Sequence, residues 1–571
     1  MVDRNSVDEG PHSNALSGGE HVYEALVEAG IELVVGLPGT QTLPIDRVIA
    51  DRDEIRYVMA RHETAIPHVA WGHFESSGDL AATLTVPGPG DTNVMHGLKN
   101  AKEDCVPIVH LSADVNPADR GRNPIHEIEP DTFDNVTKEN INISNEHELP
   151  HRLARAISVA KTPPFGPVRV GIPSEILTDE FRAPTSQYQS ETIDFKNLEA
   201  YVGTADRLRS AERPVVYVGG GCRRSPEDVD AIRSLAETLD APVFSTFKGK
   251  GVYPEDDGRF VGVTASFLPA GGKRVLERAD CVAAFGVDFD GLATAHWTLP
   301  MGESLIHVNI DPGEIDRPDY EADVAIVDDA VKAAAKLGDE VDVDRTRSWN
   351  GREIAQEVRN EYLDNLHHKG LLKDTDPART PAVLRRIREV LPDETVVTTD
   401  VGGFRLWALE LFETNHPTQF ITAGSWAGMG VGLPAAMGAA LANSSLPVVS
   451  FTGDGGLLMC LQELQTLREN DLNVTVVVFN NGDYGTISKS PEIRDFGEGS
   501  RFAWNSPNFE SIAHGFNIPA ETVSKPSEAA DAVQEATEQT GPSLVDVHID
   551  PDEPSEKDGA DYEPSFELEG T

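Results

Sequence analysis

The chain has 571 residues, too many for one hydrophobic core, and this length predicts about three to four domains. It carries 95 Asp and Glu residues against 48 Lys and Arg residues, a formal net charge of −47. Because such a chain repels phosphate backbones, the charge argues against nucleic acid as a partner. In about 1 M salt the Debye length falls to about 3 Å, so the same charge predicts a salt-rich cytoplasm, as in haloarchaea.

Export, membrane and redox signals all favour an intracellular location. The sequence shows no basic, apolar leader and no stretch near the roughly 18 apolar residues that a membrane span requires. Its four cysteines are scattered singly, a pattern that favours small buried hydrophobic residues over a zinc site or a redox pair. We therefore expect a cytoplasmic protein without a membrane partner.

The N-terminal part predicts a disordered segment followed by an α/β unit. Residues 1–16 are polar, and residues 17–184 alternate between strand, loop and helix patterns. Ser17 and Glu20 have the spacing of a capping box, which marks the start of the first helix. Three loops of this unit carry polar or glycine-rich runs near strand ends: Gly36-Leu37-Pro38-Gly39-Thr40, Arg61-His62-Glu63 and Pro87-Gly88-Pro89-Gly90.

Two further α/β units follow in the sequence. Strand and helix patterns fill residues 200–340 and, after a charged helical connector at 345–370, residues 375–550. Alternating strands and helices predict parallel sheets with helices on both faces. The chain is therefore expected to form three consecutive doubly wound α/β domains, with a disordered acidic tail at residues 551–571.

The third unit contains a motif that suits a divalent metal ion. Gly453-Asp454-Gly455 follows an apolar strand, and Asn480-Asn481 closes the next strand after a helix-like stretch at 457–464. Such a βαβ crossover brings both motifs to one edge of the sheet. Carboxylate and carboxamide oxygens suit Mg²⁺ when diphosphate oxygens fill its other positions, and the glycines let the backbone approach phosphate. An ordinary Asp-Gly turn and an Asn-rich loop would give the same residues.

These paired elements resemble the diphosphate-binding motif of thiamine diphosphate enzymes, in particular the acetolactate synthase and 2-oxo acid decarboxylase group. That group has pyrimidine-binding, central and diphosphate-binding domains in succession, so the resemblance covers nearly the whole chain. It implies thiamine diphosphate and Mg²⁺ as cofactors. By the same resemblance Asp454 and Asn481 supply side-chain ligands to Mg²⁺, and the carbonyl of Asp483 supplies a third.

The resemblance also implies which residues hold the cofactor. Glu63, in an Arg-His-Glu run, corresponds to the carboxylic acid that hydrogen-bonds the aminopyrimidine ring. Met429 corresponds to the apolar residue that keeps the cofactor bent, although simple packing in a glycine-rich loop is the other interpretation. The remaining expected cofactor contacts are Pro87, Gly88, Asp400, Gly402, Gly428, Gly453, Asp454, Gly455, Asn481, Tyr484 and Gly485.

The expected catalytic residues are Glu63 and two more, Thr40 and His126. Thr40 stands where benzoylformate decarboxylase-like sequences have a substrate-contacting Ser, so the resemblance implies a hydrogen bond to the substrate carboxylate. His126 stands near the Gln-Glu pair of acetolactate synthases and is a candidate for proton transfer. A solvated loop histidine is the alternative interpretation of His126.

The reaction outcome is less sharply defined than the cofactor. Tyr484-Gly485-Thr486-Ile487 replaces the Gln-Gly-Met-Val stretch of acetolactate synthases, whereas Lys248-Gly249-Lys250-Gly251 still resembles that group. We expect decarboxylation of a 2-oxo acid with carboligation to a second carbonyl. A simple 2-oxo acid decarboxylase and a non-catalytic, cofactor-binding regulatory protein are the alternatives.

The resemblance further implies partners. In the family the domain that holds Glu63 faces the diphosphate domain of another subunit, which implies a homodimer or a homotetramer acting on a small-molecule 2-oxo acid. Some members hold flavin in the central domain. Gly219-Gly220-Gly221 fits either a nucleotide site or a tight strand-to-helix turn, so FAD stays open.

Overall fold

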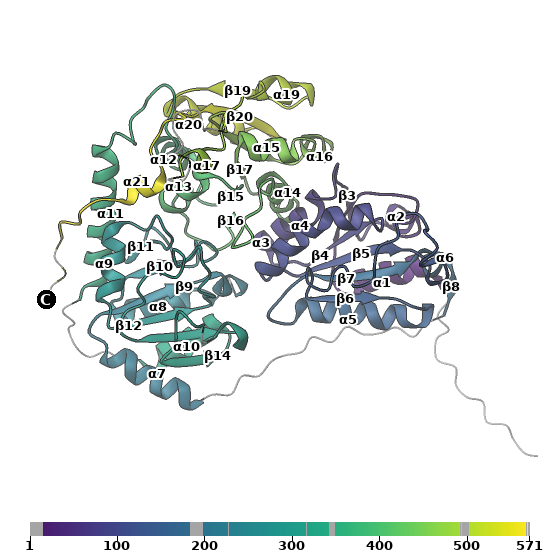
Figure 1. Cartoon of the computed structure of the whole chain (residues 1–571), viewed down its shortest axis with the longest axis horizontal. Coiled ribbons are helices and arrows are strands. Elements are labelled where there is room, and N and C mark those ends of the chain that lie inside the picture. Colours follow the sequence, from purple (N-terminus) through teal and green to yellow (C-terminus); the bar gives the residue numbers. More distant parts are fainter. Residues whose placement is uncertain are drawn as a thin grey trace, which may run out of the picture. The chain divides into compact units, whose positions relative to one another are not determined.

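The computed structural model of the chain divides into two compact units (Figure 1). The first comprises Met1–Pro67, Leu80–Leu98 and Pro107–Glu191, and the second comprises His68–Asp79, Lys99–Val106 and Thr192–Thr571. The structure describes residues 15–182, 198–225, 228–315, 317–341, 349–490, 493, 502–566 and 568. Most of the N-terminal segment expected to be disordered, residues 1–14, lies outside the described residues.

The first unit is built on a six-stranded parallel sheet with the strand order β3-β2-β4-β5-β7-β6. Strands β4, β5 and β7 are buried along their whole length, as expected when helices cover both faces. The strands are β2 (Leu33–Gly36), β3 (Arg56–Met59), β4 (Ala81–Thr85), β5 (Ile108–Asp114), β6 (Glu139–Asn142) and β7 (Val168–Pro173).

The first helix beside this sheet begins where the sequence predicts. Ser17 and Glu20 form both hydrogen bonds of the predicted capping box at the start of α1. A short antiparallel pair, β1 (Leu16–Ser17) with β8 (Glu180–Phe181), joins the two ends of this segment. The helices in this part of the chain are α1 (Gly18–Glu28), α2 (Leu43–Ala50), α3 (Ala65–Ser77), α4 (Pro89–Glu103), α5 (Leu149–Lys161) and α6 (Ser174–Thr178). Most of α3 and the last residues of α4 belong to the second unit.

The second unit contains two more six-stranded parallel sheets, of which the first has the strand order β11-β10-β9-β12-β13-β14. Its strands are β9 (Pro214–Val218), β10 (Val243–Ser245), β11 (Phe260–Val263), β12 (Cys281–Phe285), β13 (Leu305–Asn309) and β14 (Val324–Val327). Its helices are α7 (Leu198–Ser210), α8 (Asp230–Leu239), α9 (Ala270–Arg278) and α10 (Ala330–Glu340).

The last sheet has the strand order β16-β15-β17-β18-β20-β19. Its strands are β15 (Val396–Thr399), β16 (Phe420–Thr422), β17 (Val448–Gly453), β18 (Val474–Asn480), β19 (Ala520–Val523) and β20 (Ser543–His548). The connector helix α11 (Gly351–His368) precedes it. The other helices are α12 (Thr380–Val390), α13 (Gly403–Leu411), α14 (Gly432–Ala442), α15 (Asp454–Cys460), α16 (Glu463–Glu469), α17 (Gly485–Ser488), α19 (Phe509–Gly515), α20 (Pro526–Glu538) and α21 (Glu556–Ala560).

Strand order shows that the first and last sheets share one topology. If the strands of each sheet are numbered 1 to 6 in chain order, their spatial order is 2-1-3-4-6-5 in both the first and the last sheet. In the middle sheet the spatial order is 3-2-1-4-5-6. The prediction of three doubly wound parallel α/β domains is confirmed. In such sheets ligands bind beyond the carboxyl ends of the strands, where the direction of winding reverses. This point lies between β2 and β4 in the first sheet and between β15 and β17 in the last sheet.

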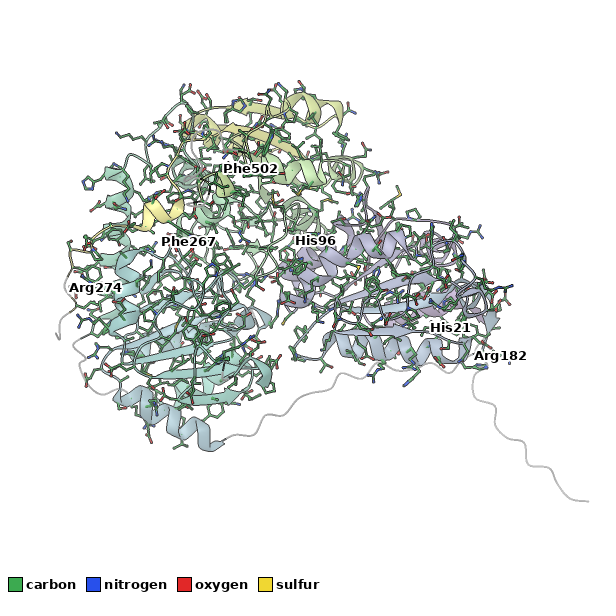
Figure 2. The ribbon with its side chains drawn as sticks, in the orientation of Figure 1. His21, His96, Arg182, Phe267, Arg274 and Phe502 are labelled. Carbon is green, nitrogen blue, oxygen red and sulfur yellow. The ribbon has the colours of Figure 1, made fainter. Side chains whose placement is uncertain are left out.

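Two expectations about local structure were wrong. The helix-like stretch at 457–464 is divided between α15 and α16, because the buried Glu463 begins a new turn and accepts a 2.7 Å hydrogen bond from Thr466 Oγ1. The acidic tail is not unstructured throughout, since it forms α21 behind a capping box at Ser555. Phe566 is buried, and Arg274 of α9, labelled in Figure 2, donates a 2.9 Å hydrogen bond to its carbonyl.

None of the helices in the described part of the chain has the length and apolar character needed to span a bilayer.

Candidate active site

Glu63 lies in the turn between β3 and α3 and is half-buried. Asn93 Nδ2, on α4, donates a 3.0 Å hydrogen bond to Glu63 Oε2. Gly90 packs closely on the end of β4, because a Cβ atom there would lie 2.9 Å from Val86 Cγ2, and Glu63 Oε1 is farther away at 3.7 Å. The start of α4 therefore orients Glu63 through Asn93.

A buried charge network fixes this start of α4. Asp91 accepts hydrogen bonds from Arg169 Nη2 at 2.9 Å, His110 Nε2 at 3.1 Å and Ser112 Oγ at 2.8 Å. The side chains of Asp91 and Arg169 are 0% and 1% exposed. Burial alone would raise the pKa of Asp91, but the His110 hydrogen bond and the Arg169 charge outweigh it and hold the pKa below its usual value.

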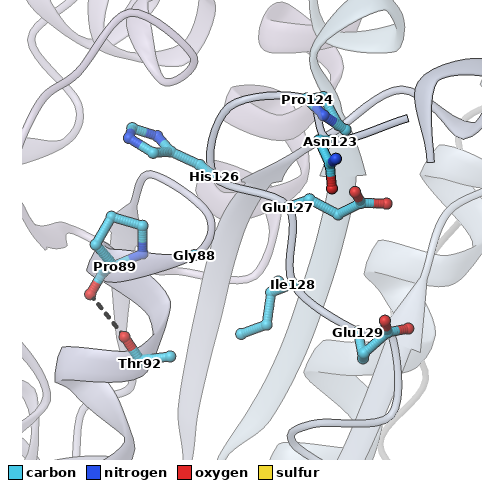
Figure 3. Close-up of a pocket in the computed structure, with 9 residues that line it drawn as sticks. All are labelled: Gly88, Pro89, Thr92, Asn123, Pro124, His126, Glu127, Ile128 and Glu129. Atoms are coloured by element: carbon cyan, nitrogen blue, oxygen red, sulfur yellow. Dashed lines mark hydrogen bonds between the residues drawn. The ribbon is translucent and has the colours of Figure 1, made fainter. Parts of the chain in front are cut away.

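Gly88 and His126 meet where the loop after β5 crosses the loop before α4 (Figure 3). Gly88 has φ +65°, and a Cβ atom there would lie 2.8 Å from the carbonyl oxygen of His126. Gln41 Nε2 lies 3.2 Å from His126 Nδ1. Both loops line a cavity of about 610 Å³. The structure thus brings two predicted site residues together, and it adds Gln41 to them.

Thr40 and Pro87 complete the predicted set in the first unit. Thr40 is exposed and follows the Gly-Leu-Pro-Gly loop after β2, next to Gln41. Pro87 precedes Gly88 at the end of β4. All the predicted residues of this unit therefore lie on loops beyond the carboxyl ends of β2, β3, β4 and β5.

In the second unit, Asp454 is the first residue of α15, directly after β17, and is 2% exposed. Its Oδ2 accepts hydrogen bonds from Gly482 N at 3.0 Å and Ser506 Oγ at 2.8 Å. Burial raises the pKa of Asp454, and these neutral donors offset only part of the rise. No Lys, Arg or His lies within ion-pair distance of this carboxylate among the described residues, so a cation there would stabilise it.

Asn481 follows β18, the neighbour of β17 in the sheet. Its Oδ1 accepts a 3.1 Å hydrogen bond from the N–H of Asp483, whose own side chain accepts one of 2.7 Å from Ser488 Oγ. Gly485 faces Asn481, since a Cβ atom there would lie 2.9 Å from Asn481 Nδ2. The Asp454 and Asn481 motifs therefore stand at adjacent strand ends, as the βαβ pattern predicts.

Asp400, after β15, is fully buried and ties the surrounding loops together. Its carboxylate accepts hydrogen bonds from the N–H groups of Val401 at 2.6 Å, Gly430 at 2.9 Å and Gly432 at 3.3 Å. Burial raises the pKa of Asp400, and these backbone donors work against the rise. Asp400 thus fixes the loop that carries Met429, which is half-buried beside Gly428.

Aromatic side chains close the glycine turn at Asp454. A Cβ atom at Gly455 would lie 2.8 Å from the Tyr484 ring and 3.3 Å from Trp504. The rings of Tyr484 and Trp504 lie 4.7 Å apart. Gly453 and Gly402 both face the Phe404 ring. A Cβ atom at Gly453 would lie 3.3 Å from this ring, and one at Gly402 would lie 2.6 Å from it. The glycines are therefore required by close packing around the motif.

The donor set fits Mg²⁺ and a diphosphate. Asp454 and Asn481 offer a carboxylate and a carboxamide oxygen, the hard donors that Mg²⁺ prefers. The Asp454 carboxylate is buried among neutral donors only, which favours a bound cation at this position.

Sequence reasoning missed several residues that shape these sites. Ser506 and Gly482 bind Asp454, and Gln41 contacts His126, but none of them belongs to a motif. The pairing of Asp91 with Arg169 joins residues 78 positions apart. The hydroxyl of Ser506, the amide of Gln41 and the charges of Asp91 and Arg169 are common features, and the contact of Gly482 comes from its backbone N–H, so none of them signals a role in the sequence.

Comparison with known proteins identifies the family. Residues 16–135, 203–337 and 400–547 match the N-terminal TPP binding, central and C-terminal TPP binding domains of thiamine pyrophosphate enzymes, respectively. The acetolactate synthase isozyme 1 large subunit of Escherichia coli (strain K12) is 29% identical over 547 residues, which cover 94% of this chain and 95% of the relative.

Archaeal and other bacterial relatives match over a similar length. The probable acetolactate synthase large subunit of Methanocaldococcus jannaschii is 29% identical, with 94% of this chain and 93% of the relative covered. The acetolactate synthase large subunit of Lactococcus lactis is 27% identical, with 93% and 92% covered. The chain therefore belongs to the thiamine pyrophosphate (thiamine diphosphate) enzymes and is similar to acetolactate synthase large subunits along nearly its whole length.

Proposed function

We propose that the protein uses thiamine diphosphate and Mg²⁺ to decarboxylate a 2-oxo acid and to join the product to a second carbonyl compound. The observation that carries this proposal is the buried Asp454 carboxylate, which has neutral hydrogen-bond donors but no cationic side chain within ion-pair distance in the described residues. Family membership and similarity to acetolactate synthase large subunits support it. The three domains are assigned to residues 17–184, 200–340 and 375–550.

Each residue has a defined task in this proposal. Asp454, Asn481 and the carbonyl of Asp483 hold Mg²⁺ against the diphosphate. Bound thiamine diphosphate supplies a carbon nucleophile and takes up the electrons released with CO₂. Glu63, oriented by Asn93, exchanges a proton with the aminopyrimidine ring.

The other predicted residues of both units surround the cofactor and substrate. Gly402, Gly453 and Gly455 are assigned to the loops that bind the diphosphate, where a glycine backbone can approach phosphate oxygens. Met429 supports the bent cofactor, and Asp400 fixes the loop that carries it. Thr40 binds the substrate carboxylate, and His126 moves a proton at the substrate oxygen.

A simple decarboxylase is the second candidate, and Tyr484 favours it. Where acetolactate synthases have Gln, this chain places an aromatic ring that packs on Trp504 beside Gly455. A bulky ring at this position reduces the room for a second carbonyl compound. The fate of the decarboxylated substrate therefore separates the two candidates.

A product assay tests both candidates. A panel of 2-oxo acids is incubated with the enzyme, thiamine diphosphate and Mg²⁺, and CO₂ and the organic products are measured. Hydroxy-keto acid products support the synthase, and CO₂ with aldehydes alone supports the decarboxylase. Cofactor binding without CO₂ release would support a regulatory protein and contradict the proposal.

We also propose that a second copy of the chain covers the surface around Asp454, giving a homodimer or homotetramer. Exposed large hydrophobic side chains lie on the segments that build this site: Trp426, Leu458, Met459, Tyr484, Ile487 and Phe502 (Phe502 is labelled in Figure 2). Such a gathering is typical of an interface. Light scattering after chromatography should show a dimer or larger species, and full activity in a monomer would contradict the proposal.

The cellular setting follows from the net charge of −47. We propose a salt-rich cytoplasm, because about 1 M salt screens repulsion beyond about 3 Å. The unfolding temperature should therefore rise between about 0.1 M and about 2 M KCl, whereas an unchanged or lower temperature would contradict the proposal.

A further inference from the structure

The run Lys248-Gly249-Lys250-Gly251 lies outside the proposed cofactor contacts, yet both of its lysines reach elements of the last sheet. The run follows β10 of the middle sheet. A Cβ atom at Gly249 would lie 2.4 Å from the carbonyl oxygen of Val218, the last residue of β9, so the run packs directly on that sheet. Lys250 is fully buried, and its Nζ donates a 2.9 Å hydrogen bond to the carbonyl of Leu409 on α13. The run therefore connects the middle sheet to the last one.

Strand β16 forms an edge of the last sheet, and cations from loops of the middle sheet cover this edge (Figure 1). The carbonyl of Gln419 accepts a hydrogen bond from β15, so the carbonyls of Phe420 and Thr422, one and three positions later, point away from the sheet. Arg223, in the turn after β9, donates a 3.0 Å hydrogen bond to the Phe420 carbonyl. Lys248 Nζ donates one of 3.1 Å to the Thr422 carbonyl. Both outward carbonyls thus have a charged donor.

Charged side chains also hold the two residues after β16. Arg405 Nη1, on α13, donates a 3.1 Å hydrogen bond to the carbonyl of Ala423. Asp104, directly after α4, accepts a 3.1 Å hydrogen bond from the N–H of Gly424 through its Oδ1. A Cβ atom at Gly424 would lie 2.4 Å from the same oxygen, so glycine is required beside this carboxylate. The loop that carries Met429 therefore starts at a fixed point.

Lys248 joins the edge strand to Asp104. Its Nζ lies 3.2 Å from Asp104 Oδ2 and 3.4 Å from Oε1 of the buried Glu75 on α3. Burial alone would raise the pKa of Glu75, but the charges of Lys248, Arg224 and Arg223 outweigh it and hold the pKa well below its usual value. Two carboxylates and the outward carbonyl of β16 therefore fix the position of the Lys248 ammonium group.

We propose that Lys248 is a positioning residue for the cofactor, because it fixes strand β16 and, with Asp104, the start of the loop that carries Met429. Asp400 fixes the end of this loop through the N–H of Gly430. With both ends held, the loop is ordered before thiamine diphosphate arrives, and this lowers the cost of ordering it on binding. The inference rests on the proposed use of thiamine diphosphate and gives the middle domain a part in cofactor binding.

Hydrogen exchange of the full-length protein without cofactor tests the fixed loop by itself. Lys248→Met removes the ammonium group and keeps an unbranched side chain, whereas Lys248→Arg keeps the charge. In Lys248→Met the amides of residues 420–430 should exchange at least about tenfold faster than in the wild type, and Lys248→Arg should restore most of the protection. Lys332→Met, a change of an exposed lysine on α10 in the same domain, should leave the exchange unaltered.

Titration calorimetry with thiamine diphosphate and Mg²⁺ tests the link to the cofactor. The Kd should rise at least about tenfold in Lys248→Met and stay within about threefold of the wild type in Lys248→Arg. A merely structural role would lower the fraction of chains that bind but leave the Kd of the folded chains unchanged. If Lys248→Met does not fold, Gly424→Ala serves, because its methyl group displaces Asp104 from the loop. Gly515→Ala is its control, since an added Cβ atom there meets open space among the described residues.

Three results would overturn the proposal. One is unchanged exchange of residues 420–430 in Lys248→Met. Another is faster exchange with an unchanged Kd for thiamine diphosphate. The last is an equal loss of affinity in Lys248→Met and Lys332→Met. Absence of thiamine diphosphate binding in the wild type would instead contradict the proposed function, and the exchange rates would still decide whether Lys248 fixes the loop.

Discussion

The first and last sheets share one strand order, and each has a buried Asp at the same position of the fold, but the partners of the two carboxylates differ. In each sheet the third strand along the chain, β4 or β17, runs into a helix that carries an Asp in its first turn. In the first sheet this residue is Asp91, and in the last sheet it is Asp454. Both are buried, with exposed fractions of 0% and 2%.

The partners of the two carboxylates differ. Asp91 meets Arg169 and His110, and its pKa lies below the usual value despite burial. Among the described residues, Asp454 Oδ2 meets the Gly482 N–H and the Ser506 hydroxyl and no cation, and burial raises the pKa of Asp454. A buried carboxylate with its own cation stabilises the fold, whereas one with neutral donors alone is suited to a cation from outside.

The largest expected effect falls on turnover and tests the task assigned to the first sheet. Glu63→Gln should lower CO₂ release about 10²- to 10⁴-fold, because the variant cannot exchange a proton, while thiamine diphosphate still binds. Release is measured with the best 2-oxo acid of the panel, and binding by calorimetry. Glu32→Gln, an exposed change in the same unit, is the control. Unaltered turnover in Glu63→Gln would remove this residue from the proposed role.

The next effect falls on stability and tests the contrast directly. Asp91→Ala should lower the free energy of unfolding by about 3–5 kcal/mol, because the buried Arg169 loses its nearer carboxylate, at 2.9 Å, and keeps only Asp114 at 4.0 Å. Asp454→Ala should cost far less stability, since in the part of the chain that the structure describes no side-chain cation loses a partner. Denaturant unfolding of both variants measures the difference. Equal losses of unfolding free energy would show that the two carboxylates stabilise the fold to the same extent and would contradict the contrast.

The pH dependence of stability sharpens this test. The folded pKa of Asp91 lies below the unfolded value, so its stabilisation is complete above about pH 4 and is lost as the pH falls through the folded pKa. The wild type and Asp91→Ala should therefore become more alike in strong acid. A difference that stays constant down to about pH 2 would contradict the assignment.

The smallest effect concerns the orientation of Glu63. Asn93→Ala removes the 3.0 Å hydrogen bond to Glu63 Oε2 and should lower turnover about tenfold, with little change in cofactor affinity. Asn93→Asp keeps the size but places a second carboxylate beside Glu63, and this should shift the pH profile of turnover to higher pH. A profile identical to that of Asn93→Ala would point to a structural role alone.

Much of the fold and part of the site could be predicted from the sequence. Regular alternation of buried strands and helices carries enough information to give three parallel sheets, and the capping box at Ser17 marks α1. The glycines flanking Asp454 were predicted to let phosphate approach the backbone, and in the structure they also leave room for the rings of Phe404 and Tyr484. These signals are local in the chain.

What the sequence could not predict depends on distant pairings. Arg169 reaches Asp91 only because β7 lies beside β5, and no local pattern announces that partner. Ser506 and Gln41 likewise enter the sites through loop geometry. The acidic tail was misjudged because composition alone hides α21, which a single capping box at Ser555 supports.

The central claim is that Asp454 holds a divalent cation against the diphosphate of the cofactor, and calorimetry of thiamine diphosphate binding tests it most directly. With Mg²⁺ present, the wild type should bind the cofactor saturably, and removal of Mg²⁺ by a chelator or the change Asp454→Ala should each weaken binding at least about tenfold. Binding that is equally tight without Mg²⁺, or in Asp454→Ala, would contradict the account.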